Sequence, residues 1–180
     1  MAAHLHDSVL QTLALIQRSR SAPDMAALAR IQERDLRTWL YGRTRTSPNG
    51  QELLSAAIDG VAGRIERMHR VAVEVVVVGD APVDDRLRAV LDAAGEAMNN
   101  AAKHSGASVV SVYVEVGPEA VNLYVRDEGT GFDSARLPPD RRGIADSIVR
   151  RMERHGGLAS VASGASTGTE VHLRMPRRAP

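Results

Sequence analysis

The segment 87–105 most narrowly limits how this chain can fold. Its apolar residues recur every three or four positions, as expected for a helix with one buried face: Leu87, Val90, Leu91, Ala94, Met98 and Ala101. Glu96 and Asn100 stand four residues apart, and Lys103 follows, so these polar side chains project from neighbouring turns of a second face. A polar face is usually only a solvated surface, so this helix does not define a site by itself.

A glycine-containing loop further along the chain indicates that the polar face could belong to a binding site. In 127–132, DEGTGF, Gly129 and Gly131 allow the backbone to turn sharply and to approach a ligand. Asp127 ends an apolar strand and offers a carboxylate acceptor beside that loop. Many tight turns contain two glycines, so the order and spacing of the motifs carry more information than the loop alone.

The motifs occur in a recognisable order. A helix with E-x-x-x-N is followed by D-x-G-x-G, then by Gly143, where we expect another helix to begin, and then by Gly168-Thr169 before a strand. This order resembles the Bergerat-fold ATPases and, among them, the ATP-binding domain of sensor histidine kinases. The resemblance implies an α+β fold, in which the domain is a two-layer α/β sandwich.

Local patterns predict the other elements of this sandwich. Apolar spacing and β-branched runs predict helices over 51–68 and 144–155 and strands over 71–78, 108–116, 120–126, 158–162 and 170–175. The short segment Gly79–Pro82 would turn the chain from the first strand into the helix that carries Asn100.

The N-terminal residues predict a helical hairpin. One amphipathic helix runs to about Ser21, and a second runs from there to about Tyr41, where Gly42 can end it. Such a hairpin has too small an interior to be stable alone, so we expect a second copy to complete a four-helix bundle. The predicted organisation is a dimerisation hairpin over 1–42, a polar linker over 43–50 and a catalytic domain over 51–180.

The hairpin contains the motif H-D-x-x-x-Q, formed by His6, Asp7 and Gln11. A single helical histidine is more often a surface or packing residue than a nucleophile. Followed by a Bergerat-type domain, however, this motif resembles the phosphoacceptor region of histidine kinases related to the nitrate-sensing and lipid-fluidity-sensing types. The resemblance implies that His6 is phosphorylated, that Asp7 accepts the imidazole proton or fixes its tautomer, and that Gln11 orients water during dephosphorylation of a partner.

The same resemblance implies roles at an ATP and Mg²⁺ site. Asn100 matches the magnesium-binding asparagine, and Glu96 matches a carboxylate that orients a metal-bound water or assists proton transfer. Lys103 and, more weakly, His104 are placed for phosphate contact. Asp127 matches the aspartate that accepts a hydrogen bond from the adenine amino group. The remaining matches are Gly129 and Gly131 near the base and ribose, Gly143 near phosphate, and Thr169 near the adenine pocket.

Three departures from the family pattern affect these expectations. The segment 133–142, which would form the lid over bound ATP, is short. The family's second glycine-rich motif is represented here by Gly143 alone, with no further glycine after it. His6 also lies one turn from Met1, whereas the family's first helix extends well before its histidine. We therefore expect this chain to be the cytoplasmic part of a longer, membrane-linked sensor protein without its input domain.

Composition excludes several other functions. Lys and Arg total 23 against 22 for Asp and Glu, and no basic stripe is present, so we expect no nucleic-acid partner. The chain has no cysteine, which excludes disulfides and thiolate chemistry. No apolar run approaches the ~20 residues that span a bilayer, so we expect no direct membrane contact in this segment.

The predicted function is autophosphorylation of His6 by ATP, followed by phosphoryl transfer to the receiver domain of a response regulator. Two alternatives stay open. One is a Bergerat-fold protein-serine kinase of the anti-sigma kind, which needs no H-D-x-x-x-Q hairpin. The other is a dimeric signalling module that is non-catalytic or mainly a phosphatase and has a weak nucleotide pocket.

Overall fold

The chain divides into two units, Met1–Thr44 and Arg45–Pro180. The computed structural model describes residues 46–131, 139–164 and 167–177, all of them in the second unit. Between 139 and 145 it describes the backbone but not the side chains. The predicted hairpin over 1–42 lies outside the described residues, and so do most of the residues of the predicted lid.

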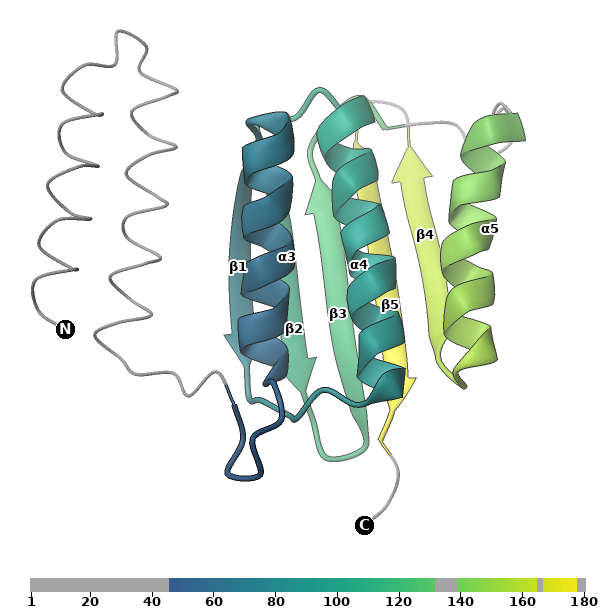
Figure 1. Ribbon diagram of the computed structural model, residues 1–180. Coiled ribbons are helices and arrows are strands. Elements are labelled where there is room, and N and C mark those ends of the chain that lie inside the picture. The colour runs from purple at the N-terminus through teal and green to yellow at the C-terminus, as the bar shows by residue number, and fades with distance from the viewer. Residues whose placement is uncertain (1–45, 132–138, 165–166, 178–180) are drawn as a thin grey trace, which may run out of the picture. The chain divides into compact units, whose positions relative to one another are not determined.

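A five-stranded mixed sheet forms one layer of the described unit (Figure 1). Its strands are β1 (Ala72–Val78), β2 (Val109–Val116), β3 (Ala120–Asp127), β4 (Leu158–Gly164) and β5 (Gly168–Pro176), arranged in the order β1-β2-β3-β5-β4. The pair β1 and β2 is parallel, and the other neighbouring pairs are antiparallel.

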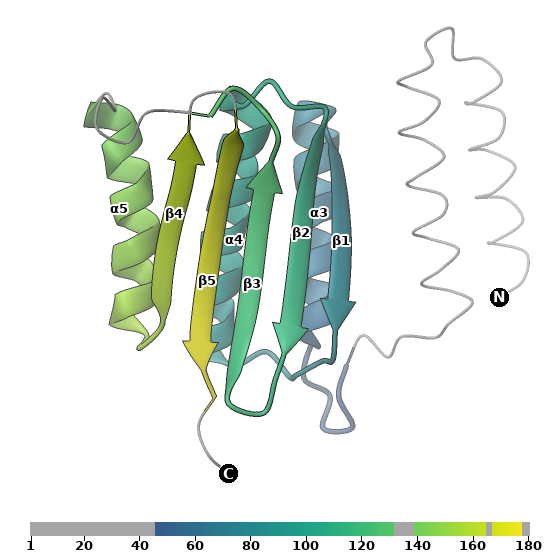
Figure 2. The same ribbon diagram turned by 180° about the vertical axis from the view of Figure 1, so that it is seen from behind.

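Three helices form the second layer, and all of them pack on the same face of the sheet. They are α3 (Leu54–His69), α4 (Asp85–His104) and α5 (Pro139–Arg154). Figure 1 shows α4 between the other two, and Figure 2 shows the opposite face of the sheet, which no described helix covers. The predicted α+β architecture, a two-layer α/β sandwich, is therefore confirmed.

The core lies between the two layers, and α4 is central to it. The whole predicted stripe of α4 is buried, including Val90 and Met98, which are fully inaccessible to solvent. Asp84 caps the helix by accepting a hydrogen bond of 2.8 Å from the backbone N–H of Leu87. In β2 and β3, buried and more exposed residues alternate, as expected for strands that are covered on one face only.

One predicted boundary is wrong. The helix expected to begin near Ile144 begins at Pro139. Proline favours the first turn of a helix, because its fixed φ fits there and its missing N–H is not needed. Gly143 therefore lies inside α5 and does not open it.

Candidate functional site

The buried carboxylate of Asp127 stands at the end of β3. The residue is 3% exposed, and its Oδ1 accepts a hydrogen bond of 3.0 Å from the backbone N–H of Gly129. In the antiparallel register of β3 and β5, Asp127 is the partner of Thr169. The hydroxyl of Thr169 lies 3.0 Å from the hydroxyl of Ser163 on β4, so three neighbouring strands contribute polar groups to this end of the sheet.

The loop after β3 is joined directly to the end of α4. The backbone N–H of Thr130 donates a hydrogen bond of 2.9 Å to the carbonyl of Ser105, which follows the last turn of the helix. A Cβ on Gly129 would overlap this carbonyl. A Cβ on Gly131 would overlap the carbonyl of Gly164, and Gly131 has a positive φ of 59°. Packing within the chain therefore suffices to require both glycines, whether or not a ligand approaches them.

The polar face of α4 points toward α5. Glu96 Oε2 is 3.2 Å from Nη2 of Arg151 and 3.4 Å from Oγ of Ser147, both on α5. Asn99 instead lies 2.8 Å from a ring nitrogen of His69 on α3. Because Asn100 follows Glu96 by one helical turn, it lies on the α5 side of α4, whereas its neighbour Asn99 is bonded to α3.

Lys103 and His104 occupy the last turn of α4, and both side chains are exposed. The α4 end, the loop after β3 and the start of β5 lie at the same end of the unit (Figure 1). The described residues contain no cluster of three or more His, Asp or Glu side chains that could hold a metal ion without other ligands.

The structure does not describe three of the predicted site residues, and it places Gly143 elsewhere than expected. His6, Asp7 and Gln11 lie outside the described residues. Gly143, predicted to offer a free N–H at a helix start, is the fifth residue of α5. At that position an α-helix pairs its N–H with the carbonyl of Pro139, so Gly143 does not occupy the helix start at which the contact was expected, and its contact with phosphate stays a prediction.

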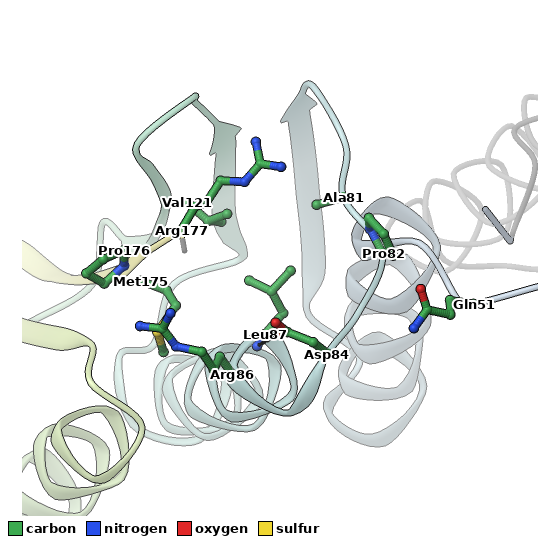
Figure 3. Close-up of a pocket in the computed structure, with 10 residues that line it drawn as sticks. All are labelled: Gln51, Ala81, Pro82, Asp84, Arg86, Leu87, Val121, Met175, Pro176 and Arg177. Atoms are coloured by element: carbon green, nitrogen blue, oxygen red, sulfur yellow. Dashed lines mark hydrogen bonds between the residues drawn. The ribbon is translucent and has the colours of Figure 1, made fainter. Parts of the chain in front are cut away.

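A hollow of about 260 Å³ lies at the opposite end of the sheet (Figure 3). It is lined at the start of α4 by the N-cap residue Asp84 and by Arg86 and Leu87, and at the end of β5 by Met175, Pro176 and the following residue Arg177. Both arginines are held by backbone carbonyls: Arg86 Nε is 3.2 Å from His155 O, and Arg177 Nη1 is 3.0 Å from Gly117 O. None of the predicted site residues lines this hollow, so it is not the candidate nucleotide site.

The sequence analysis missed Arg151 and Ser147, the two residues that contact Glu96. A signal for them exists. They are four residues apart, so they share one face of α5, and each precedes by one position a buried residue, Ile148 and Met152. That places them at the edge of the buried stripe, where a polar side chain can reach a neighbouring helix.

The family is shown by comparison with known proteins. Residues 83–179 match the family described as "Histidine kinase-, DNA gyrase B-, and HSP90-like ATPase". This range is more than half of the chain. It contains α4, the loop after β3, and the strands β3 and β5, which carry Asp127 and Thr169. The chain belongs to this ATPase family.

Curated relatives narrow the resemblance to sensor kinases. The chain is 31% identical over 94 residues to "Sensor histidine kinase LiaS" of Bacillus subtilis, covering 52% of this chain and 25% of that protein. It is 33% identical over 118 residues to "Sensor histidine kinase GtrS" of Pseudomonas aeruginosa, covering 58% and 24%. It is also 34% identical over 80 residues to "Nitrate/nitrite sensor protein NarQ" of Escherichia coli, covering 43% and 14%. The matched regions span a quarter or less of each relative.

Solved structures support the fold. The histidine kinase domain of the blue-light activated histidine kinase of Erythrobacter litoralis matches with a TM-score of 0.55 at 17% identity, covering 97% of this chain and 94% of that one. The ATP binding domain of PrrB from Mycobacterium tuberculosis matches with a TM-score of 0.55 at 22% identity, covering 68% and 93%. Among the described residues, no helix combines the length and the apolar character that crossing a bilayer requires.

Proposed function

We propose that this chain is the core of a sensor histidine kinase, in which ATP phosphorylates His6 and the phosphoryl group then passes to a response regulator. The observation that carries the proposal is the buried carboxylate of Asp127, opposite Thr169 and at the same end of the unit as the polar end of α4. The resemblance to sensor kinases supplies the direction of transfer.

Asp127 would select the base. A buried carboxylate offers only acceptor oxygens when it is ionised, and adenine presents an amino donor at its six position. Guanine presents a carbonyl oxygen there, so its acceptor would face another acceptor. The hydrogen bond from Gly129 N–H to Oδ1 restrains the carboxylate, and Oδ2 would accept the hydrogen bond from the adenine amino group. Thr169 would stand beside the base.

The α5-facing side of α4 would hold the phosphates. The side-chain oxygen of Asn100 is a hard neutral ligand suited to Mg²⁺, and Glu96 one turn earlier can accept a hydrogen bond from a metal-bound water. When bound, Mg²⁺ would neutralise charge on the phosphate oxygens. Lys103 and His104 are exposed on the last turn of α4, where their side chains can move toward a polyphosphate.

The transfer step would occur on His6. An imidazole nitrogen of His6 forms a bond to the γ-phosphorus while the bond from that phosphorus to the bridging oxygen breaks, and ADP leaves. Asp7 takes the proton that the imidazole loses, and a phosphoramidate remains. An aspartate of the receiver domain then accepts the phosphoryl group, and Gln11 would orient water when the regulator is dephosphorylated. We place these steps in a cytoplasmic homodimer formed through the hairpin.

The test is incubation of the full chain with Mg²⁺-ATP labelled at the γ-phosphate. We expect acid-labile, base-stable label on the wild type and its loss in His6→Ala and Asn100→Asp. Asn99→Asp is a matched control, because Asn99 is bonded to His69 on the α3 side of the same helix. This variant should keep most of the label.

The other outcomes identify the alternatives. Acid-stable label on a partner protein would favour a protein-serine kinase. Failure of the wild type to bind Mg²⁺-ATP would favour a non-catalytic dimeric module. Binding without any label on His6, together with dephosphorylation of a phosphorylated receiver domain that depends on Gln11, would favour a phosphatase.

A further inference from the structure

Arg151 of α5 bridges two acidic residues of α4. Its Nη2 lies 3.2 Å from Glu96 Oε2, and its Nη1 lies 3.9 Å from Asp92 Oδ2. The two acidic residues are four apart and therefore stack on one side of α4. Ser147, one turn before Arg151 on α5, donates a hydrogen bond of 3.4 Å to the same oxygen of Glu96. One carboxylate oxygen of Glu96 thus receives two donors from α5.

This contact is more enclosed than an ordinary surface ion pair. The side chains of Glu96 and Arg151 are 24% and 32% exposed, whereas those of the pair Glu52 and Arg88 at the start of α4 are 47% and 55% exposed. Within the described part of the chain, Nε of Arg151 is buried and has no hydrogen-bond partner. The Arg151 side chain is therefore partly enclosed, and lower exposure strengthens its attraction to the carboxylate.

We propose that Arg151 is a positioning residue that holds the Glu96 carboxylate in one orientation, with Ser147 as its second support. The inference rests on the proposed function, because Glu96 stands one turn before Asn100. Held in this way, Glu96 serves as a fixed acceptor that orients water beside Asn100.

A double-mutant cycle in the full chain tests this role. The variants are Glu96→Gln, Arg151→Met and the double variant, and the readouts are kcat and KM for His6 labelling and the Kd of Mg²⁺-ADP. Loss of a residue that orients a metal-site carboxylate typically costs about 10- to 100-fold in activity or metal affinity. We expect a loss in kcat of about 10-fold in Arg151→Met, and no further loss when Arg151→Met is added to Glu96→Gln.

Two further variants separate positioning from folding. Arg151→Lys keeps the charge but not the fork that spans two carboxylates, so it should recover only part of the rate. Arg88→Met removes the ion pair with Glu52, which has a similar length of 3.3 Å. Arg88 lies on α4, two helical turns before Glu96, so this variant should leave kcat unchanged. Urea unfolding of the same cycle measures whether Glu96 and Arg151 stabilise the fold jointly, independently of nucleotide.

Each outcome decides the inference. Additive effects on kcat, or an equal loss in Arg88→Met, would overturn it while the wild type still binds nucleotide and is labelled. A wild type that binds no nucleotide would overturn the proposed function and this role together. In that case a coupling seen only in urea unfolding would identify the pair as purely structural.

Discussion

Asp127 at the end of β3 lies directly opposite Thr169 near the start of β5. The residue before Thr169 is Gly168, whose Cα packs so close to the backbone carbonyl of Asp127 that a Cβ there would overlap the oxygen. The backbone position of the buried carboxylate is thus set by two strands, and its side chain is oriented by Gly129 N–H. A group fixed on three sides loses little entropy when it binds a ligand, which suits a residue that selects a base.

We predict that Asp127→Asn weakens Mg²⁺-ATP binding by about 10- to 100-fold, because a hydrogen bond to a charged group is replaced by a neutral one or by a donor facing a donor. Isothermal titration of the purified chain measures the change. Glu128→Gln is the control, since Glu128 is adjacent but exposed, with an ion pair to Arg126 of 3.8 Å. Equal Kd values for the wild type and Asp127→Asn would remove Asp127 from the site.

Gly168→Ala should destabilise the fold by more than the strain of a left-handed residue alone. Gly168 has φ +77° and no room for a Cβ, whereas Gly106 has φ +71° with nothing within 4 Å of the Cβ position. We expect about 1 kcal/mol for Gly106→Ala from backbone strain and about 3 kcal/mol for Gly168→Ala, where overlap is added. Urea unfolding of both variants measures the difference, and equal losses would show that the strands move apart to admit the methyl group.

Much of this fold was predictable from local patterns. The stripe from Leu87 to Ala101 predicted α4 because burial on one face leaves a period in the sequence, and the β-branched run over 71–78 predicted β1 for a similar reason. The start of α5 was not predicted, because a proline can either end a loop or open a helix, and only the tertiary context decides between them.

Residues of the candidate site could be predicted from the sequence only where they belong to a motif with a known role. The resemblance assigned Asp127 and Thr169 to one site, and the register of β3 and β5 brings them together, but the ion pair of Glu96 with Arg151 was not predicted. Arginines are frequent on exposed helix faces, and although Arg151 can be placed at the edge of the apolar stripe of α5, nothing local shows which neighbouring helix it contacts. The packing of α5 against α4 makes Glu96 its partner, and a contact between two separate helices cannot be read from the residue spacing within either of them.

Asp80 is expected to matter more to stability than its exposed position suggests. Its Oδ1 accepts hydrogen bonds from the backbone N–H groups of Ser55, 3.1 Å, and Ala81, 2.9 Å, and its Oδ2 accepts one from the Ser55 hydroxyl, 2.5 Å. Leu53, at the N-cap position of α3, makes no side-chain capping bond, so Asp80 caps this helix from a distant part of the chain.

We predict that Asp80→Ala lowers the free energy of unfolding by about 2 kcal/mol, at the upper end of the range for helix caps. Asp84→Ala removes the local cap of α4, a single bond to Leu87 N–H, and should cost about 1 kcal/mol. Thermal and urea unfolding of the two variants gives the comparison. A smaller loss in Asp80→Ala than in Asp84→Ala would show that water replaces the long-range cap without cost.

Stability should fall in mild acid because of His172. Its ring stacks on Tyr124 with centroids 4.3 Å apart, and a ring nitrogen lies 3.3 Å from Asn122 Oδ1. In β5 His172 alternates with the buried residues Val171 and Leu173, so its side chain lies on the sheet face opposite the helices. Burial lowers the pKa of His172 below its ordinary value of 6.5, and Arg174 acts in the same direction, while Glu170 opposes them.

The sign of the pH effect follows from this direction. Between the lowered folded pKa of His172 and the unfolded value of 6.5, the unfolded chain binds more protons than the folded chain, so stability rises with pH across that window. The stabilisation is complete above the unfolded pKa and is lost as the pH falls below it.

His172→Phe keeps an aromatic ring against Tyr124 but cannot titrate. We therefore expect the difference in unfolding free energy between about pH 7.5 and about pH 5.5 to be smaller in this variant than in the wild type, as measured by urea unfolding. An unchanged difference would mean that other groups account for the acid sensitivity and that protonated His172 is accommodated on the open sheet face.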